Sequence, residues 1–341
     1  MKAIGYRATG PLEREDALVA FEAETPVAKG RDVLVRISAI SVNPVDTKIR
    51  ANRPPLSGDI DILGWDAVGE VVGLGEAASC FKPGDRVWYA GAIDRPGTNS
   101  EFHLVDERIV GHAPQSISDA AAAALPLTTL TAYEMLFDRL RVTDPVPGAG
   151  SGADGAVLII GGSGGVGSIA IQLLRALTDC TIIATASREG TMQWCRDLGA
   201  HHVIDHSQPL PEQISALGIG APAFVFSTTH SHEYCEQVAE LIAPQGRFGL
   251  IDDPAEFPIA PFKRKSISLH WEFMYTRSLF GTADIARQAD ILNEVAGLID
   301  AGKIRSTATE TLGAINVANL RAAHALLESH KAKGKLVLEG F

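Results

Sequence analysis

The chain has 341 residues, a formal net charge of −11 at pH 7 and 46% hydrophobic residues. This length favours two domains, because single hydrophobic cores stop growing near roughly 250 to 300 residues. The composition is typical of a globular protein. The negative charge disfavours nucleic acid and anionic membrane surfaces as partners.

The cysteines and the N-terminus indicate where the protein resides. Cys80, Cys180, Cys195 and Cys235 lack the short paired spacings of a disulfide framework, which favours reduced thiols. The N-terminus has no apolar run typical of a signal peptide, and no later stretch is expected to span a bilayer. We therefore expect a cytoplasmic protein that does not enter a membrane.

The first third of the sequence has the pattern of β-strands separated by turns. In the run 32–40, Val33, Val35 and Ile37 share one face, as period-2 alternation requires. Further strands are predicted at 67–72, 86–89 and 101–105, followed by helices at 119–124 and 131–140. This part is expected to form a compact antiparallel β domain with a helical bridge to the next domain.

From residue 156 onward, predicted strands and helices alternate, which indicates parallel strands with helical crossovers. The predicted strands are 156–160, 181–185, 202–204, 223–227, 247–251 and 266–271, the last at the sheet edge. The predicted helices are 168–177, 191–198 and 234–243, and the tail adds helices 285–301 and 317–329 and a strand at 335–338. The segment 142–155 is expected to be an exposed loop. The fold class is therefore α/β with a doubly wound parallel sheet.

A glycine-rich turn follows the first strand of this alternating region. It consists of Gly161, Gly162, Ser163, Gly164, Gly165, Val166 and Gly167. Gly162, Gly164 and Gly167 satisfy G-x-G-x-x-G between an apolar strand and an apolar helix. In such a motif the first glycine permits the sharp turn, the second admits a pyrophosphate, and the third allows close packing of helix on strand. The motif predicts dinucleotide binding at a helix N-terminus.

Two other motifs share these residues. The run 161–165 also spells G-x-S-x-G, which would make Ser163 the nucleophile of a serine hydrolase. A hydrolase of that kind normally builds several strand and helix units before its nucleophile, and here the preceding chain is mainly β. A P-loop is disfavoured because no Lys-Ser or Lys-Thr follows Gly167.

The end of the second strand indicates which nicotinamide cofactor binds. NAD sites place an acidic residue there, whereas here Ser187 and Arg188 follow the strand 181–185. A hydroxyl and a guanidinium would bind a 2′-phosphate, so NADPH is favoured. Glu189 is expected to face solvent at the start of the next helix.

With these residues established, the chain resembles the medium-chain dehydrogenase/reductase superfamily over its whole length, particularly the quinone oxidoreductase and zinc-type alcohol dehydrogenase-like branch. The motifs that carry the resemblance are residues 41–46 (SVNPVD), 64–69 (GWDAVG), 82–87 (KPGDRV), 125–132 (LPLTTLTA) and the glycine turn. The resemblance implies a chaperonin-10-like catalytic domain, 1–124 and 266–341, and an inserted Rossmann domain, 125–265, with the active site in the cleft. It also implies a homodimer, for which the edge strand near 266–271 is the expected interface.

The sequence departs from the zinc-dependent members of the superfamily. Those members place Cys where Asn43 stands and His-Glu where Trp65 and Asp66 stand, and neither substitute supplies the ligands that zinc prefers. A cluster of four cysteines for a structural zinc is also absent, so no metal is expected. The histidine clusters 201–202, 206 and 230–232 are interpreted chiefly as polar strand-end residues.

The resemblance also implies roles for individual residues. Asn43 and Asp46 would lie near the nicotinamide, Thr128 near its ribose or amide, and Tyr89 at the cleft wall as a proton donor. Turn formation by Asn43 and ordinary strand packing by Tyr89 are the alternatives.

Further contacts are implied for the nucleotide and the substrate. Ser187 and Arg188 would contact the 2′-phosphate, His206 the ribose phosphate and Thr228 the ribose. Residues 273–275 resemble an apolar lid, with core packing as the alternative, and the tail 331–335 either reaches the cofactor or forms a solvated turn.

The sequence therefore predicts a zinc-independent, NADPH-dependent oxidoreductase that passes hydride to quinones, α,β-unsaturated ketones or similar small carbonyl compounds. Two alternatives remain open: a serine hydrolase that uses Ser163, and a non-catalytic, crystallin-like NADPH-binding protein.

Overall fold

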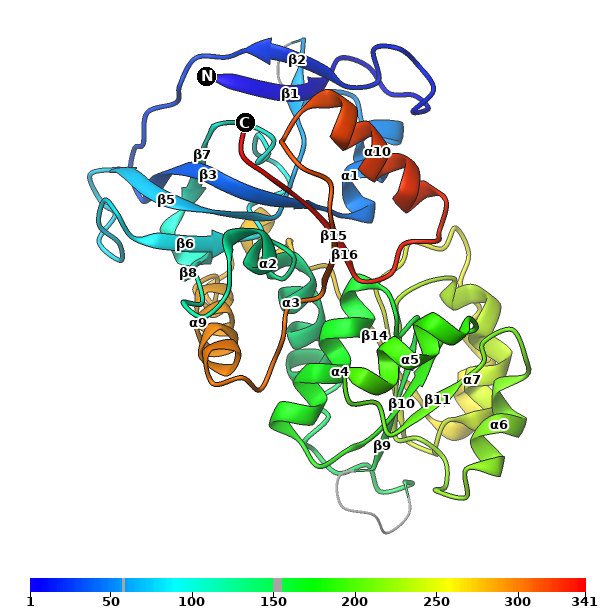
Figure 1. The fold of residues 1–341 in the computed structure, drawn as a ribbon. Helices are drawn as coiled ribbons and strands as arrows, with labels where there is room; N and C mark the ends of the chain where they lie inside the picture. The colour runs from blue at the N-terminus through cyan, green and yellow to red at the C-terminus, as the bar shows by residue number, and fades with distance from the viewer. Residues whose placement is uncertain (57–58, 150–154) are drawn as a thin grey trace. The chain divides into compact units, whose positions relative to one another are not determined.

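The chain forms two compact units, and Figure 1 labels most of their helices and strands. The computed structural model describes residues 1–56, 59–149 and 155–341, so part of the predicted loop 142–155 lies outside the described residues. The first unit combines Met1–Leu130 with Tyr275–Phe341, and the second is Thr131–Met274. Both boundaries differ from the predicted 124/125 and 265/266. The second one differs because the strand at 268–271 pairs with the sheet of the second unit.

The first unit is built on two sheets. Its strands are β1 (Lys2–Tyr6), β2 (Val19–Glu22), β3 (Asp32–Val42), β4 (Asp61–Ile62), β5 (Ala67–Leu74), β6 (Arg86–Tyr89), β7 (Phe102–Asp106), β8 (Val110–His112), β15 (Ala308–Thr311) and β16 (Lys335–Glu339). The larger sheet has the order β15-β16-β3-β5-β6-β8, with β7 also paired to β3, and the smaller one has the order β2-β1-β4. The predicted antiparallel β domain is confirmed, although β15 and β16 run parallel.

Strand β3 organises this unit because it pairs with three other strands. Val33, Val35 and Ile37 are buried as their alternation predicts, whereas Arg36 is exposed and forms an ion pair with Glu70 on β5. The antiparallel partners of β3 are β5, β7 and β16. The N-terminal and C-terminal parts of the chain therefore share one sheet.

Helices cover the sheets of the first unit. They are α1 (Pro44–Asn52), η1 (Glu107–Ile109), α2 (Asp119–Ala123), α3 (Pro126–Tyr133, which crosses the unit boundary), α8 (Thr276–Phe280), α9 (Arg287–Asp300) and α10 (Val317–Glu328). The predicted tail helices correspond to α9 and α10.

One helical run corrects a prediction from the sequence. The run Asp119–Arg139 is long and apolar enough to cross a membrane by length and composition, contrary to the expectation that no stretch qualifies. However, 83% of its 18-residue window is buried inside the protein, as in the core helix of a globular protein.

The second unit is a parallel sheet with connecting helices. Its strands are β9 (Ala156–Ile160), β10 (Thr181–Thr185), β11 (His202–Ile204), β12 (Phe224–Ser227), β13 (Arg247–Leu250) and β14 (Ser268–Trp271). Its helical segments are the π-helix η2 (Glu134–Arg139), α4 (Gly165–Leu177), α5 (Glu189–Asp197), α6 (Leu210–Ala216), η3 (Ser231–Tyr234), α7 (Cys235–Leu241) and η4 (Ala260–Lys265). All neighbouring strands are parallel in the order β11-β10-β9-β12-β13-β14. This is a doubly wound order. The chain first adds strands on one side of β9 (β10, then β11) and then adds strands on its other side (β12, β13 and β14), so the order reverses between β9 and β12.

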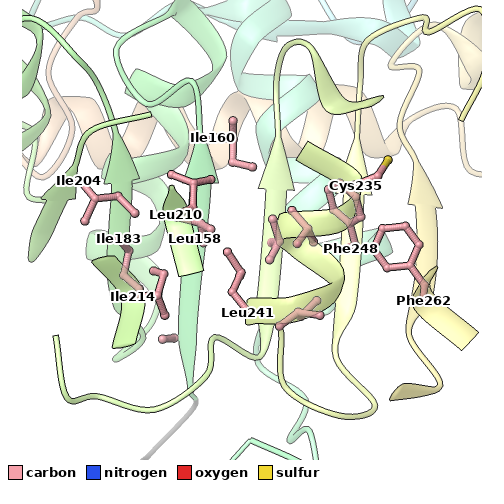
Figure 2. Packing of buried hydrophobic residues seen from close by; sticks show 14 residues of the cluster. Leu158, Ile160, Ile183, Ile204, Leu210, Ile214, Cys235, Leu241, Phe248 and Phe262 are labelled. Carbon is pink, nitrogen blue, oxygen red and sulfur yellow. The ribbon is translucent and has the colours of Figure 1, made fainter. Parts of the chain in front are cut away.

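One face of this sheet packs against α6, α7 and η4, as Figure 2 shows. Leu158 and Ile160 of β9 point into this cluster, while Val157 and Ile159 are buried on the opposite face, where α4 packs. Because both faces are covered, β9 is an unbroken apolar run rather than an alternating one. The predicted doubly wound sheet is confirmed.

A buried pair of carboxyl groups lies at the side of the same unit. Glu134 opens the π-helix η2, and Glu272 follows β14; both side chains are buried, and Arg139 Nε lies 2.7 Å from Glu272 Oε2. Burial raises the pKa of Glu272 to about 8, and the negative charge of Glu134 adds to this, against the opposing charge of Arg139. The protonated form of Glu272 is therefore favoured by folding.

We predict that the stability of the protein falls as pH rises from about 4.5 to about 8 because of this group. The folded state binds the extra proton in that range, so the free energy of unfolding is highest below it. Glu272→Gln, which mimics the neutral form, should stabilise the protein at pH 8 by about 1–3 kcal/mol relative to its effect at pH 5. Denaturant unfolding at both pH values checks this, with exposed Glu256→Gln as the control. An equal effect of Glu272→Gln at both pH values would contradict the prediction.

Candidate active site

The glycine turn lies where the sheet order reverses, directly after β9. Gly161 has φ +86°, a left-handed conformation that glycine adopts without strain. The sharp turn was predicted at Gly162, and this is wrong by one residue, because Gly161 is the glycine with the left-handed backbone. The end of β10 fixes the turn: Thr185 Oγ1 accepts a hydrogen bond from the Gly161 amide at 3.0 Å, and the Thr185 carbonyl accepts one from the Gly162 amide at 3.1 Å.

The three glycines of the motif meet different surroundings. A Cβ at Gly162 would lie 2.8 Å from the Cβ of Ala184, and one at Gly167 would lie 2.3 Å from the carbonyl oxygen of Gly161. Both glycines are therefore required for close packing of α4 on the sheet. At Gly164 a Cβ would have one neighbour, the carbonyl oxygen of Gly161 at the ordinary contact distance of 3.6 Å, so this position is less crowded than the other two. The backbone at Gly164 is thus accessible to a ligand.

Helix α4 presents its N-terminus at this open position. Gly164 is its N-cap, the first turn contains no acidic side chain, and the helix continues for 13 residues. The first backbone N–H groups of a helix have no intrahelical acceptor and carry the positive end of the helix dipole. Together with the open side of Gly164, these groups fit the diphosphate of a dinucleotide.

Thr228 lies beside the same turn. A Cβ at Gly161 would come within 2.3 Å of Thr228 Oγ1, and this hydroxyl donates to the carbonyl of Ile160 at 3.0 Å. The structure therefore brings Thr228, predicted to contact the ribose, next to the glycine turn. Thr185, whose contacts hold the turn, was missed from the sequence, and its place at the end of β10 was the only signal.

Basic side chains gather at the carboxyl ends of the strands on one side of the turn. Ser187 and Arg188 are exposed after β10, and Arg188 is the N-cap of α5. Burial lowers the pKa of His206, and the positive charges of Arg188 and His230 lower it further, against the carboxylate of Asp205. The predicted residues Arg188 and His206 are thus close enough to interact, and His230 joins them.

His230 and Glu189 lie near these basic side chains. His230 has φ 51° and ψ 33°, a left-handed conformation that is unusual outside glycine, and its Nδ1 lies 2.7 Å from Thr229 Oγ1. The sequence interpretation treated His230 as an ordinary polar residue. Glu189 faces solvent as expected, with an 83% exposed side chain 3.5 Å from Arg196.

The geometry of Ser163 does not match a nucleophile elbow. Ser163 is partly buried and is not one of the residues with a positive φ, whereas that motif strains the backbone at its serine. Among the hydrogen bonds of the described residues, none joins Ser163 to a histidine or a carboxylate. Ser163 therefore forms part of the turn.

In the first unit, a buried polar cluster holds the predicted residues Asn43 and Asp46. Asn43 follows β3 and is the N-cap of α1, where its backbone N–H donates to Asp46 Oδ2 at 2.8 Å. The Asn43 side chain donates through Nδ2 to Asp66 Oδ2 at 2.8 Å and accepts at Oδ1 from Lys335. Burial raises the pKa of Asp46 to about 7, against the hydrogen bond from the Asn43 backbone and the charge of Lys335.

Tyr89 and Thr128 are buried separately. Tyr89 OH lies 3.0 Å from His103 Nδ1, and His103 Nε2 lies 2.9 Å from the carbonyl of Pro96. Since a carbonyl only accepts, Nε2 carries the ring proton and Tyr89 donates to Nδ1. Burial raises the pKa of Tyr89 well above its ordinary value. This arrangement favours a structural role for Tyr89. Thr128 Oγ1 donates to the carbonyl of Leu125 at 3.1 Å.

The predicted apolar lid is not uniformly buried. Phe273 is 46% exposed, whereas Met274 and Tyr275 are each only 3% exposed. The ring of Tyr275 lies edge-on to Trp65, with 6.4 Å between centroids. Core packing therefore describes Met274 and Tyr275, and only Phe273 is presented to solvent.

The side chains at the positions of the zinc ligands do not fit zinc. Trp65 is only a donor, and its indole N–H bonds to the carbonyl of Ala92 at 3.1 Å. Asn43 and Asp66 offer oxygen atoms, but the ammonium of Lys335 is bonded to both. A metal cation at these oxygen atoms would be repelled by the ammonium of Lys335. Among the described residues, no group of three or more His, Cys, Asp or Glu side chains could hold a metal ion.

The four cysteines are free thiols, as predicted. Cys180, Cys195 and Cys235 are buried, whereas Cys80 is exposed. Burial, together with Glu107, raises the pKa of Cys80, so its thiol is not activated.

Comparison with known proteins agrees with the fold. Residues 29–115 match the alcohol dehydrogenase GroES-like domain, and residues 198–338 match the zinc-binding dehydrogenase family. A zinc-type alcohol dehydrogenase-like protein of Staphylococcus aureus is 37% identical over 99% of both chains. A mitochondrial NAD(P)H oxidoreductase of Homo sapiens is 31% identical over 90% of this chain and 81% of its own length.

Solved structures have the same fold. A structure described as a putative zinc-dependent alcohol dehydrogenase from Rhizobium etli has a TM-score of 0.97 and 55% identity, covering 100% of this chain and 98% of that one. The quinone oxidoreductase of Escherichia coli in complex with NADPH has a TM-score of 0.83 at 24% identity, covering 99% of this chain and 100% of that one, and supports the fold alone. This chain is therefore an oxidoreductase of the medium-chain dehydrogenase/reductase superfamily, related to the zinc-type alcohol dehydrogenase-like proteins.

Proposed function

We propose that this protein is an NADPH-dependent, zinc-independent reductase of quinones, α,β-unsaturated ketones or similar small carbonyl compounds. The observation that carries the proposal is the open glycine turn at the N-terminus of α4, followed by a basic instead of an acidic end to β10. Homodimerisation through the edge strand β14 and a cytoplasmic location stay predictions.

The preference for NADPH rests on the residues after β10, β11 and β12. The exposed hydroxyl of Ser187 and guanidinium of Arg188 would bind a 2′-phosphate, and His206 and His230 add donors on the same side. A carboxylate that would bind the ribose hydroxyls of NADH is displaced to Glu189, which faces solvent. The name of the human relative, an NAD(P)H oxidoreductase, covers both nucleotides, so the preference for NADPH rests on the residues of this chain.

The proposed independence from zinc rests on the side chains around Asp66, which do not fit a zinc ion. The bound nicotinamide supplies the hydride, and without a Lewis acid the chain's own hydrogen-bond donors must orient and polarise the acceptor. Quinones and enones need the least polarisation among carbonyl acceptors, which makes them the favoured substrate class. Asp46, with its pKa raised to about 7, holds a proton near neutral pH and is the carboxyl group in the first unit best suited to transfer one.

The first test fills the open space at the turn. Gly164 has φ −73° and ψ 175°, which any residue can adopt, so Gly164→Val should fold normally. Its side chain would occupy the space proposed for the diphosphate, and NADPH affinity should fall by about a hundredfold or more by titration calorimetry. Gly190→Val on α5, where a Cβ would meet no atom within 4 Å, is the control. Unchanged NADPH affinity in a folded Gly164→Val protein would overturn the proposed site.

The second test separates NADPH from NADH. Arg188→Ala should weaken NADPH binding by about 10- to 100-fold, because a charge-assisted contact to the 2′-phosphate is lost, and should leave NADH binding nearly unchanged. Arg196→Ala, also on α5 but paired with Glu189, is the control and should leave both affinities unchanged. Equal losses for the two nucleotides would show that Arg188 does not contact the 2′-phosphate.

The third test measures the activity itself. The purified protein should oxidise NADPH with a panel of quinones and enones, and a chelator such as EDTA should leave the rate within about twofold, since no step uses a metal. Metal content and rate are measured on the same sample. Loss of the rate with chelator and its return with zinc would refute zinc independence. Nucleotide binding without turnover of any acceptor would support the non-catalytic alternative, and labelling of Ser163 by a fluorophosphonate would support the hydrolase.

A further inference from the structure

Lys335 is a buried lysine whose three donors all have partners. Its side chain is 4% exposed, and Nζ donates to the carbonyl of Val42 at 3.2 Å, to Asp66 Oδ2 at 3.1 Å and to Asn43 Oδ1. An ammonium has three N–H donors, so none remains for another ligand. The sequence interpretation placed Lys335 in a tail that either reaches the cofactor or forms a solvated turn, and its burial is not that of a solvated residue.

Asp66 is the other half of this arrangement. Its Oδ2 accepts from Ser41 Oγ at 2.7 Å, from Asn43 Nδ2 at 2.8 Å and from Lys335 Nζ, and its Oδ1 accepts from the Leu127 amide at 2.7 Å. The residue is 0% exposed. A fully buried carboxylate with four donors is stable only while its charge is balanced, and Lys335 is the cation bonded to it.

The pair joins five elements of the chain. Lys335 opens β16, Asn43 lies between β3 and α1, Asp66 precedes β5, and Leu127 is in the first turn of α3. Through Leu127 the carboxylate caps α3, the helix that carries Thr128. Through Asn43 it fixes the residue whose backbone N–H bonds to Asp46.

We infer that Lys335 is a positioning residue: its ammonium is a built-in cation that balances Asp66 and orients the Asn43 amide, and so sets the first turns of α1 and α3. The inference rests on the proposed function for its effect on turnover. Its effect on the α3 cap does not depend on that function. The same ammonium leaves no room for a metal ion among these oxygen atoms.

Lys335→Met removes the cation and leaves a buried carboxylate unbalanced. The melting temperature should fall by roughly 10 °C. In the protein without nucleotide, amide exchange of the segment 125–133 should quicken by about tenfold, because the cap on α3 weakens. The kcat should fall by about a hundredfold while the Kd for NADPH changes by less than about threefold, because misplaced groups slow turnover more than they weaken nucleotide binding.

A second variant keeps the test informative if Lys335→Met folds poorly. Lys335→Met combined with Asp66→Asn removes both charges and should recover most of the lost melting temperature. The double variant changes both side chains that orient the Asn43 amide, the ammonium at Oδ1 and the carboxylate at Nδ2, so kcat should stay low. The exposed Lys303→Met in the same unit is the control for loss of a lysine and should resemble the wild type in every measurement.

Two outcomes would overturn the inference. One is wild-type exchange of the segment 125–133 together with wild-type kcat in Lys335→Met. The other is recovery of both kcat and melting temperature in the double variant. That result would mean that Lys335 only balances the charge of Asp66 and does not orient Asn43. Failure of the proposed function is distinguishable, because the wild-type protein would then bind no nucleotide or reduce no acceptor, while the exchange measurement still decides the role of Lys335.

Discussion

The close approach of α4 to the sheet of the second unit is the constraint on which nucleotide binding depends. A side chain at Gly162 would collide with Ala184, and one at Gly167 would collide with the carbonyl of Gly161, so both positions allow glycine alone. This packing brings the N-terminus of α4 to the place where the strand order reverses. Gly164 then matters for a different reason, because a Cβ there would have only one neighbour, the Gly161 carbonyl oxygen. Packing fixes the helix, and the less crowded side of Gly164 is the proposed place of the diphosphate.

Much of this fold could be predicted from the sequence because its signals are local. The strands 156–160, 181–185 and 202–204 have the predicted bounds, since each is an apolar or β-branched run between turn residues. The glycine motif also follows from local spacing. The position of the sharp turn did not follow, because the choice between Gly161 and Gly162 depends on contacts with Thr185 and Thr228, which lie far away in the sequence.

The polar cluster of the first unit could be predicted only in part. Resemblance identified Asn43 and Asp46, but nothing local indicates that Lys335 lies beside them, since it comes almost 300 residues later in the chain and is joined to them only by the pairing of β16 with β3. The one signal was a lysine at the head of an apolar strand. Likewise, Tyr89 has the sequence context of a strand aromatic, and only the structure shows its hydroxyl bonded to His103.

Similarity to relatives that are named for zinc concerns the fold, whereas the capacity to bind zinc concerns a few side chains. The shared fold accounts for the similarity over 99% of the length, while metal binding depends on a few side chains that the fold does not fix. In this chain those positions hold an amide, an indole and a carboxylate, and a lysine from the C-terminal strand balances the carboxylate. A fixed ammonium with all donors occupied supplies charge balance and geometry, but it has no vacant coordination position for a carbonyl oxygen. The proposed preference for quinones and enones over simple aldehydes follows from this cluster, because acceptors that are already electrophilic need the least polarisation by a Lewis acid.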